Sequence, residues 1–180
     1  MRPMDTPARP TLDVVRWLCN FQGWAGTHIF DAVVPLHEAS VRTPGLIAGG
    51  QDDGSLFATL AHIAAAGETW LSRWEGNQRA TLRDGSDFSD VAAIQKSWIA
   101  VERRLAAFLR VVTQSHLDGT LHYFTTAGAP QSLPLGQTIL HATMHSAHHR
   151  AEAAVALTAL GSPPRGLDLL DFMRTGSVGA

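Results

Sequence analysis

The sequence has very little cysteine, since Cys19 is the only one in 180 residues. No disulfide can form within the chain, and a reducing compartment, by default the cytoplasm, is the expected location. An excess of charge of one sign is also lacking, because 14 basic and 16 acidic residues give a formal net charge of -2. Such a chain offers no broad electrostatic surface to nucleic acid or to anionic lipid, so we expect neither as a partner.

Long apolar runs are missing as well. No segment reaches the roughly 18 unbroken apolar residues of a membrane span, and the first ten residues, MRPMDTPARP, resemble neither a signal peptide nor an anchor. With 45% hydrophobic and 17% charged residues, the composition is typical of a globular protein. We therefore expect a water-soluble chain folded as one domain over residues 1–180, with flexible tails at 1–10 and 174–180.

Four segments have the apolar periodicity of helices, at residues 11–36, 55–74, 91–112 and 135–160. The first opens on a potential capping residue, Thr11, and contains Gly23 and Gly26, which would let another helix or a ligand approach closely. The third has the clearest pattern, with seven apolar residues alternately three and four positions apart. The fourth stops at Gly161, which is followed by two prolines.

The segments between these helices also carry signals. Residues 117–135 have short apolar runs on both sides of an Ala-Gly-Ala-Pro turn, which predicts a small β-hairpin. Residues 41–54 are rich in Gly, Pro and Asp and predict a loop. The late motif LDLLDFM, residues 167–173, predicts a short turn that packs on the other helices. Together the elements predict an all-α four-helix bundle with a long crossover and a hairpin between the third and fourth helices.

Histidine is the unusual component. Of nine histidines, four lie in the fourth helix, at positions 141, 145, 148 and 149. Side chains four positions apart lie on adjacent turns of one helical face, so His145 and His149 can share a metal ion. The same spacing relates His141 to His145, and His148 lies within the same arc, so spacing alone leaves the ligand pair open. The zinc-protease motif needs Glu directly after its first histidine, and Ser146 there disfavours such a peptidase.

His62 lies nearly opposite the apolar stripe of the second helix, in a stretch without charged residues. Because a helix that is apolar all round is usually buried, we expect this side chain to face small alanines inside the protein. By itself a histidine in such a place is more often a hydrogen-bonded core residue than a metal ligand.

Three motifs resemble those of the DinB/YfiT superfamily: NFQGWAG in the first helix, LAHIAAAGETWLSRW in the second and HATMHSAHHRAE in the fourth. The order of elements is similar too, and the resemblance spans about residues 12–173. One histidine of the second helix and two of the last bind the metal in that family. The resemblance therefore implies three ligands, His62, His145 and His149. Arg150 matches the arginine that follows them, whereas Met144 departs from a common asparagine, which concerns the surroundings of the ligands.

Three neutral imidazoles leave positions open for water or substrate, as in a catalytic centre. Zinc, nickel and iron all suit such ligands, and an ion without a carboxylate ligand strongly acidifies a bound water or thiol. Glu68 and Glu152 are candidate proton shuttles, although solvated or structural roles suit them better. His141 and His148 are assigned to places around the ligands or at the surface.

The resemblance implies an enzyme that acts on a small-molecule substrate. Characterised relatives include transferases that use a low-molecular-weight thiol and an isomerase that depends on one, so the ion would present the thiol to an electrophilic carbon. Metal-dependent hydrolysis is a close variant. The alternative is a non-catalytic metal-binding bundle, for instance in a stress response, or one that has lost its metal. Family members often pair, and the uncharged surface of the second helix is a second reason to expect a homodimer.

The remaining groups have simpler interpretations. We expect Cys19 to be a buried side chain rather than a nucleophile, because nothing near it in sequence would lower its pKa. The five tryptophans occupy helical positions that core packing explains, so an aromatic substrate pocket is not required. Four further histidines are interpreted as ordinary: His28, His37, His116 and His122.

Overall fold

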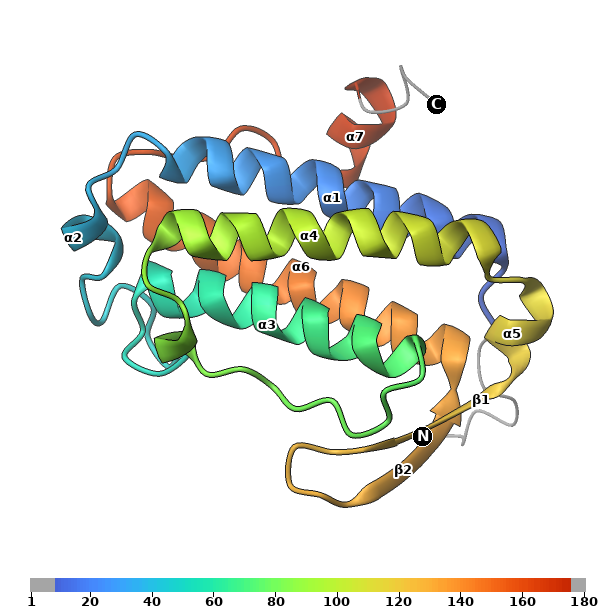
Figure 1. The fold of residues 1–180 in the computed structure, drawn as a ribbon. Coiled ribbons are helices and arrows are strands. Elements are labelled where there is room, and N and C mark those ends of the chain that lie inside the picture. Colours follow the sequence, from blue (N-terminus) through green and yellow to red (C-terminus); the bar gives the residue numbers. More distant parts are fainter. Residues whose placement is uncertain (1–8, 176–180) are drawn as a thin grey trace, which may run out of the picture.

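Four long helices make up most of the computed structural model, which describes residues 9–175: α1 (Leu12–Val33), α3 (Leu56–Trp74), α4 (Val91–Val111) and α6 (Leu135–Ala159). In Figure 1, α1 and α6 run in one direction along the bundle and α3 and α4 run in the other. α3 packs against α4 and α6, and α1 packs against α6 and, less extensively, α4. The predicted all-α four-helix bundle is confirmed.

The connection between α3 and α4, residues 75–90, is the predicted long crossover. It runs back along the bundle and includes one 3-10 turn at Gly85–Asp87 (Figure 1). Because the chain returns to the end where α3 began, α3 and α4 lie side by side and run parallel. The other connections carry short helices, α2 (Glu38–Val41) after α1 and α5 (Gln114–Asp118) after α4.

The predicted hairpin is also present. Strands β1 (Thr120–Phe124) and β2 (Pro130–Pro134) pair antiparallel, with Thr120 opposite Pro134 and Phe124 opposite Pro130. Tyr123 is the buried position of β1, and its ring lies 5.3 Å from that of Trp70 in α3. This aromatic contact joins the hairpin to the helix that carries His62.

Side-chain caps begin three of the four long helices, whereas Pro134 before α6 makes no side-chain cap hydrogen bond. The hydroxyl of Thr11 accepts a hydrogen bond from the backbone N–H of Val14 at the start of α1. Ser55 does the same for α3 and Asp90 for α4. α1 ends at Val33, three residues before the expected end, because Pro35 cannot continue a helix.

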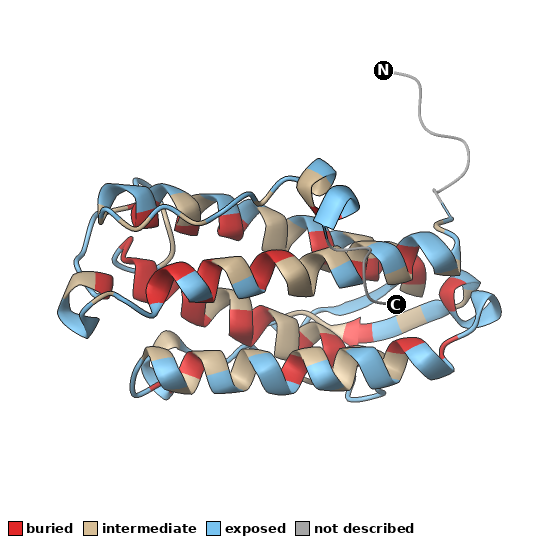
Figure 2. Cartoon of the chain, turned by 90° about the horizontal axis from the view of Figure 1, so that it is seen from above, coloured by how far each residue is buried: buried red, intermediate tan, exposed pale blue. Residues whose placement is uncertain are grey.

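The apolar core consists of two clusters of buried side chains. The larger draws on all four long helices, and the smaller contains Val15, Cys19, Leu109, Val112, Leu117 and Ile139. Buried positions recur along the long helices (Figure 2). The close approach expected at Gly26 occurs between α1 and α4, where a Cβ on this glycine would lie 2.5 Å from Cζ2 of Trp98.

α3 is the helix that carries His62, and 12 of its 19 residues are buried. α4, α6 and the 3-10 turn of the crossover cover it. Its uncharged surface, which suggested burial in a dimer, is thus covered within the chain itself. Inside the described residues, no helix combines the length and the hydropathy that crossing a membrane requires.

The last helix, α7 (Leu169–Thr175), is the predicted short turn of the LDLLDFM motif. Its buried Phe172 packs against the rings of Trp17, Phe21 and Trp24 of α1. Tails were expected at residues 1–10 and 174–180. Residues 174 and 175 instead end this helix. Residues 1–8 and 176–180 lie outside the described part.

Candidate metal centre

Three histidines from two helices converge on one point of the bundle. α3 contributes His62, and α6, its most extensive neighbour, contributes His145 and His149. Nε2 of His145 lies 3.4 Å from Nε2 of His62 and 3.3 Å from Nε2 of His149. The structure therefore brings together all three residues named from the sequence. We expected His62 to face small alanines. Its ring instead faces the imidazoles of α6, and the residue is half-buried.

The separations around His145 fit a metal ion. With metal–nitrogen bonds of about 2.0–2.1 Å, two ligands of a tetrahedral centre lie about 3.3–3.4 Å apart. Hydrogen bonds explain the arrangement less well, because Nε2 of His145 carries either one proton or one lone pair and faces two other Nε2 atoms. At most one of its two contacts can then be a hydrogen bond, whereas a shared cation satisfies all three nitrogens.

Glu152 fixes the orientation of His149. Nδ1 of His149 lies 2.7 Å from Oε2 of Glu152 and donates to it, so Nε2 of the same ring keeps its lone pair for the centre. The other carboxylate oxygen lies 3.1 Å from Nε2 of His148. Glu152, one of two candidate proton shuttles, is thus the partner of His149, while Glu68 pairs with Arg83 at 3.4 Å.

The two half-buried imidazoles are held in the neutral form. Burial, reinforced by the neighbouring His149 and His62, lowers the pKa of His145 to about 4. Burial also lowers the pKa of His62, with a further decrease from His149 and a partial increase from Asp52 and Glu152. Neutral imidazole is the form that binds metal, so these two histidines need lose no proton to bind one at neutral pH.

His148, His149 and Glu152 form a second group whose atoms could hold an ion. The side chain of His148 is 69% exposed, and binding there would use the nitrogen of His149 that Glu152 already occupies. His141 is exposed and packs its ring 5.3 Å from Trp70 and 5.8 Å from His145, so it lies beside the first group.

The centre opens onto a cleft of about 240 Å³, which His62 and His145 line together with residues of α3, the crossover and the hairpin. Trp70 and Tyr123 form an aromatic part of its wall. The sequence required no aromatic pocket, but Trp70 serves the cleft as well as the packing. An open side beside the histidines gives a small molecule access to the centre.

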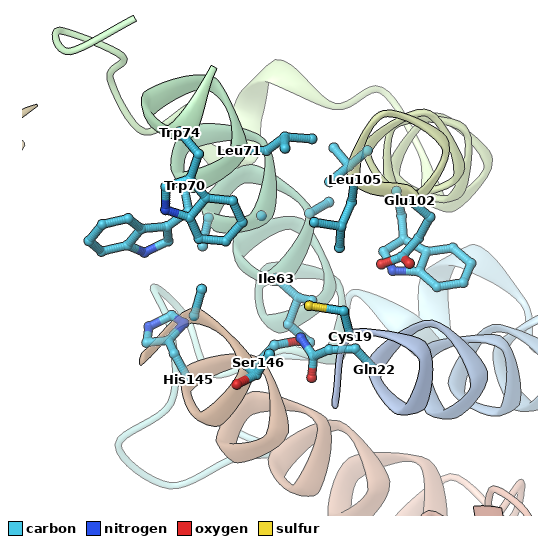
Figure 3. Close-up of a pocket in the computed structure, with 17 residues that line it drawn as sticks. Cys19, Gln22, Ile63, Trp70, Leu71, Trp74, Glu102, Leu105, His145 and Ser146 are labelled. Atoms are coloured by element: carbon cyan, nitrogen blue, oxygen red, sulfur yellow. The ribbon is translucent and has the colours of Figure 1, made fainter. Parts of the chain in front are cut away.

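A second, interior cavity of about 60 Å³ lies between α1, α3, α4 and α6 and also touches His145 (Figure 3). Cys19, Gln22, Glu102 and Ser146 supply its polar groups amid apolar side chains. Burial raises the pKa of Cys19 to about 12, an effect that Glu102 reinforces. The thiol is therefore protonated and 3% exposed, which confirms that it is a buried side chain.

Arg150 does not line the cleft. Its Nη1 donates to Oε1 of Gln22 at 2.6 Å and to Oγ of Ser146 at 3.1 Å, which ties α6 to α1 behind the three histidines. Met144, which stands where the family commonly has asparagine, is 58% exposed and so lies at the surface.

The remaining histidines have the ordinary roles expected of them. His28 packs on Trp24 with ring centres 4.2 Å apart, and Nδ1 of His122 hydrogen-bonds Oγ of Ser132 across the hairpin at 2.8 Å. His116 accepts from the backbone N–H of Thr113, and His37 is exposed before α2.

Three residues near the centre were not singled out from the sequence: Arg73, Glu102 and Tyr123. They lie on different elements, and only tertiary packing brings them to the cleft or the interior cavity. The one local signal is an arginine near the end of an otherwise largely apolar helix, at position 73.

Comparisons with known proteins agree with this fold. The model of the DinB family matches residues 20–177. Among solved structures, YfiT from Bacillus subtilis, described as a probable metal-dependent hydrolase with an unusual four-helix bundle topology, aligns with a TM-score of 0.65. The alignment covers 89% of this chain and 94% of that chain at 14% sequence identity, so it speaks for the fold alone. No curated protein matches the chain in sequence.

Proposed function

Since this chain belongs to the DinB family, we propose that it is a metal-dependent enzyme in which His62, His145 and His149 hold one divalent ion. The observation that carries the proposal is the pair of Nε2 distances at His145, 3.4 and 3.3 Å. Zinc, nickel and iron are all compatible with three imidazoles. The ion, when bound, would supply positive charge that lowers the pKa of a water or thiol.

The groups of the chain have distinct tasks in this proposal. His62 and His145 face the cleft, so they orient the centre towards a substrate. Glu152 accepts the proton at Nδ1 of His149 and holds that ring in the ligating tautomer. Trp70 and Tyr123 exclude water from one side of the cleft.

A transferase that uses a low-molecular-weight thiol is the reaction type that we favour. Cys19 is buried with a pKa of about 12, so the chain has no thiol of its own to offer as a nucleophile. An external thiol that enters through the cleft would meet the centre directly. Metal-dependent hydrolysis is the second candidate, and the fold shared with YfiT, described as a probable metal-dependent hydrolase, favours it.

Metal analysis of three proteins tests the centre. We expect about one zinc ion per chain in the wild type and in His148→Ala, an exposed neighbour on the same helix. His145→Ala should lose the ion, because His145 contacts both other imidazoles. Retention of zinc by His145→Ala would overturn the proposal, and its loss from His148→Ala alone would assign the ion to His148, His149 and Glu152.

Turnover assays separate the reaction types. The zinc-loaded chain is mixed with glutathione and monobromobimane, and separately with p-nitrophenyl acetate without thiol. Thiol-dependent turnover that His145→Ala abolishes supports the transferase, and ester cleavage that it abolishes supports the hydrolase. Bound zinc without either activity, across a panel of thiols and electrophiles, favours the non-catalytic metal-binding bundle.

A homodimer and a cytoplasmic location complete the proposal. The family resemblance alone now supports the dimer, because the uncharged surface of α3 is covered within the chain. Light scattering tests it, and a mass of one chain would contradict it. The free Cys19 suits a reducing compartment.

A further inference from the structure

Arg73 is a buried arginine in the wall of the cleft that opens in front of the three histidines. Only 5% of it is exposed. Its Nη2 donates to the carbonyl oxygens of Phe124 at 2.9 Å and Ala80 at 3.2 Å. The rings of Trp70 and Tyr123 lie 5.0 and 4.9 Å from its guanidinium carbon. The group is thus held rigidly between α3, the crossover and the hairpin.

These contacts leave the guanidinium incompletely paired. Its Nε is buried and has no hydrogen-bond partner among residues 9–175. Within the same residues, Nη1 makes no hydrogen bond, since the two bonds of the side chain both come from Nη2. Burial lowers the pKa of Arg73, and among the described residues the opposing influence comes from the hydroxyl of Tyr123 and not from a carboxylate. Buried arginines are normally paired with an anion, so this charge lacks its usual partner.

The cleft contains further groups that suit an anion. Thr69, Thr125 and Thr126 lie in its lining, and no Asp or Glu is among the described residues that form it. His62 and His145, which would hold the proposed divalent ion, line the same cleft as Arg73. Two positive charges in one cleft, with no acidic side chain among its described lining residues, attract a negatively charged molecule.

We propose that the cleft binds an anionic small molecule, a carboxylate, whose negative group pairs with Arg73 while the rest of the molecule faces His62 and His145. The inference deepens the proposed function, on which it rests, by naming the class of the substrate. The guanidinium acts here as an anchor and a specificity determinant, because hydrogen bonds to a fixed, partly desolvated charge are stronger than those to a mobile one.

Two probes of the same shape test the charge preference. Phenylacetate and the neutral phenylacetamide are titrated into the zinc-loaded chain by calorimetry. We expect the acid to bind at least about tenfold more tightly than the amide. Arg73→Met should remove this preference, whereas Arg79→Met should keep it, because Arg79 is exposed and does not line the cleft. Equal binding of the two probes to the wild type would overturn the inference.

A preference that survives in Arg73→Met would show that the ion alone attracts the acid, which also overturns the inference. A measurement on the wild type covers the case in which this variant does not fold. The Nε–H of Arg73 is buried and should give a ¹⁵N signal that is assigned by its absence from Arg73→Lys. Phenylacetate should shift this signal and phenylacetamide should not, and an unmoved signal with saturating acid contradicts the anchor.

Failure of the proposed function is recognised separately. If the wild-type chain binds no zinc, the metal centre fails, and the two probes are titrated into the metal-free chain. Arg73 should still favour the acid there, although more weakly, because its charge does not depend on the ion.

Discussion

Glu102 is a carboxyl group enclosed between α4 and α1, where it lines the interior cavity behind His145. Burial raises its pKa to about 7, and Arg150 opposes this increase. Gly23 makes room for it, since a Cβ at that position would lie 2.8 Å from Oε2 of Glu102. Gly23, which was expected to permit a close approach, thus accommodates a side chain of α4.

The charge of Glu102 should cost stability as the pH rises. Its folded-state pKa of about 7 exceeds the ordinary value of 4.5, so the folded state holds this proton more tightly than the unfolded state. The cost therefore begins near pH 4.5, grows until about pH 7 and is fully present above that. We expect Glu102→Gln to match the wild type closely near pH 5 and to be more stable by up to about 3 kcal/mol at pH 8.

Urea unfolding at both pH values measures this difference. Glu68→Gln, which removes a surface carboxylate of α3, serves as the control and should show no comparable increase between pH 5 and pH 8. A stability difference for Glu102→Gln that stays constant with pH would contradict the burial argument.

Single residues near the centre were predictable to different degrees. Helical spacing limited the candidate ligands on α6 to a few histidines, but the choice of His145 and His149 came from the family resemblance. Arg73 gave almost no signal, because its partners Ala80 and Phe124 lie 7 and 51 positions away in sequence. A buried charge of this kind becomes visible only when its surroundings are known.

The contact between α1 and α4 depends on a glycine. A Cβ on Gly26 would lie 2.5 Å from Cζ2 and 3.0 Å from Cε2 of the Trp98 ring. Gly67 of α3 differs, since a Cβ there would meet only Cγ1 of Val101 at 3.5 Å, an ordinary van der Waals distance.

Gly26→Ala and Gly67→Ala should therefore have opposite effects. The first forces the Trp98 ring or the helices apart, and we expect a loss of about 1–3 kcal/mol in the free energy of unfolding. The second removes the low helix propensity of glycine without a clash, and we expect no loss and a gain of up to about 1 kcal/mol. Chemical denaturation measures both, and similar effects in the two variants would show that helix propensity decides rather than packing.

The elements themselves were largely predictable from periodicity and capping residues. Thr11, Ser55 and Asp90 begin their helices through local hydrogen bonds, although only Thr11 was predicted as a capping residue. The short helices α2 and α5, of four and five residues, were not predicted. One turn of helix has no apolar period to detect, and its formation depends on what it packs against.

The arrangement of the helices around one another is a property of the whole molecule. Periodicity shows which face of each helix is apolar but not which helix lies beside which, and here the neighbours α3 and α4 are parallel. This arrangement places α3 against α6, so that His62 meets His145 across 83 positions of sequence. Without the family resemblance, the residues alone would have left this pairing open.

A metal ion held by α3 and α6 should stabilise the entire fold. A ligand that binds only the folded state, at a free concentration of 100 times its dissociation constant, adds about 2.7 kcal/mol. For a chain of this size that corresponds to a Tm increase of roughly 5–10 °C. Both apolar clusters consist of residues other than the three histidines, so the metal-free chain should remain folded with a lower Tm.

Calorimetry of the zinc-loaded chain with and without EDTA measures this difference. His148→Ala should show the same decrease in Tm as the wild type, because its exposed ring lies outside the first group of ligands. His145→Ala should show almost none, since it has no ion to lose. An equal decrease in His145→Ala would mean that zinc stabilises the fold from another site, and complete unfolding of the wild type by EDTA would mean that the two apolar clusters cannot hold the bundle together.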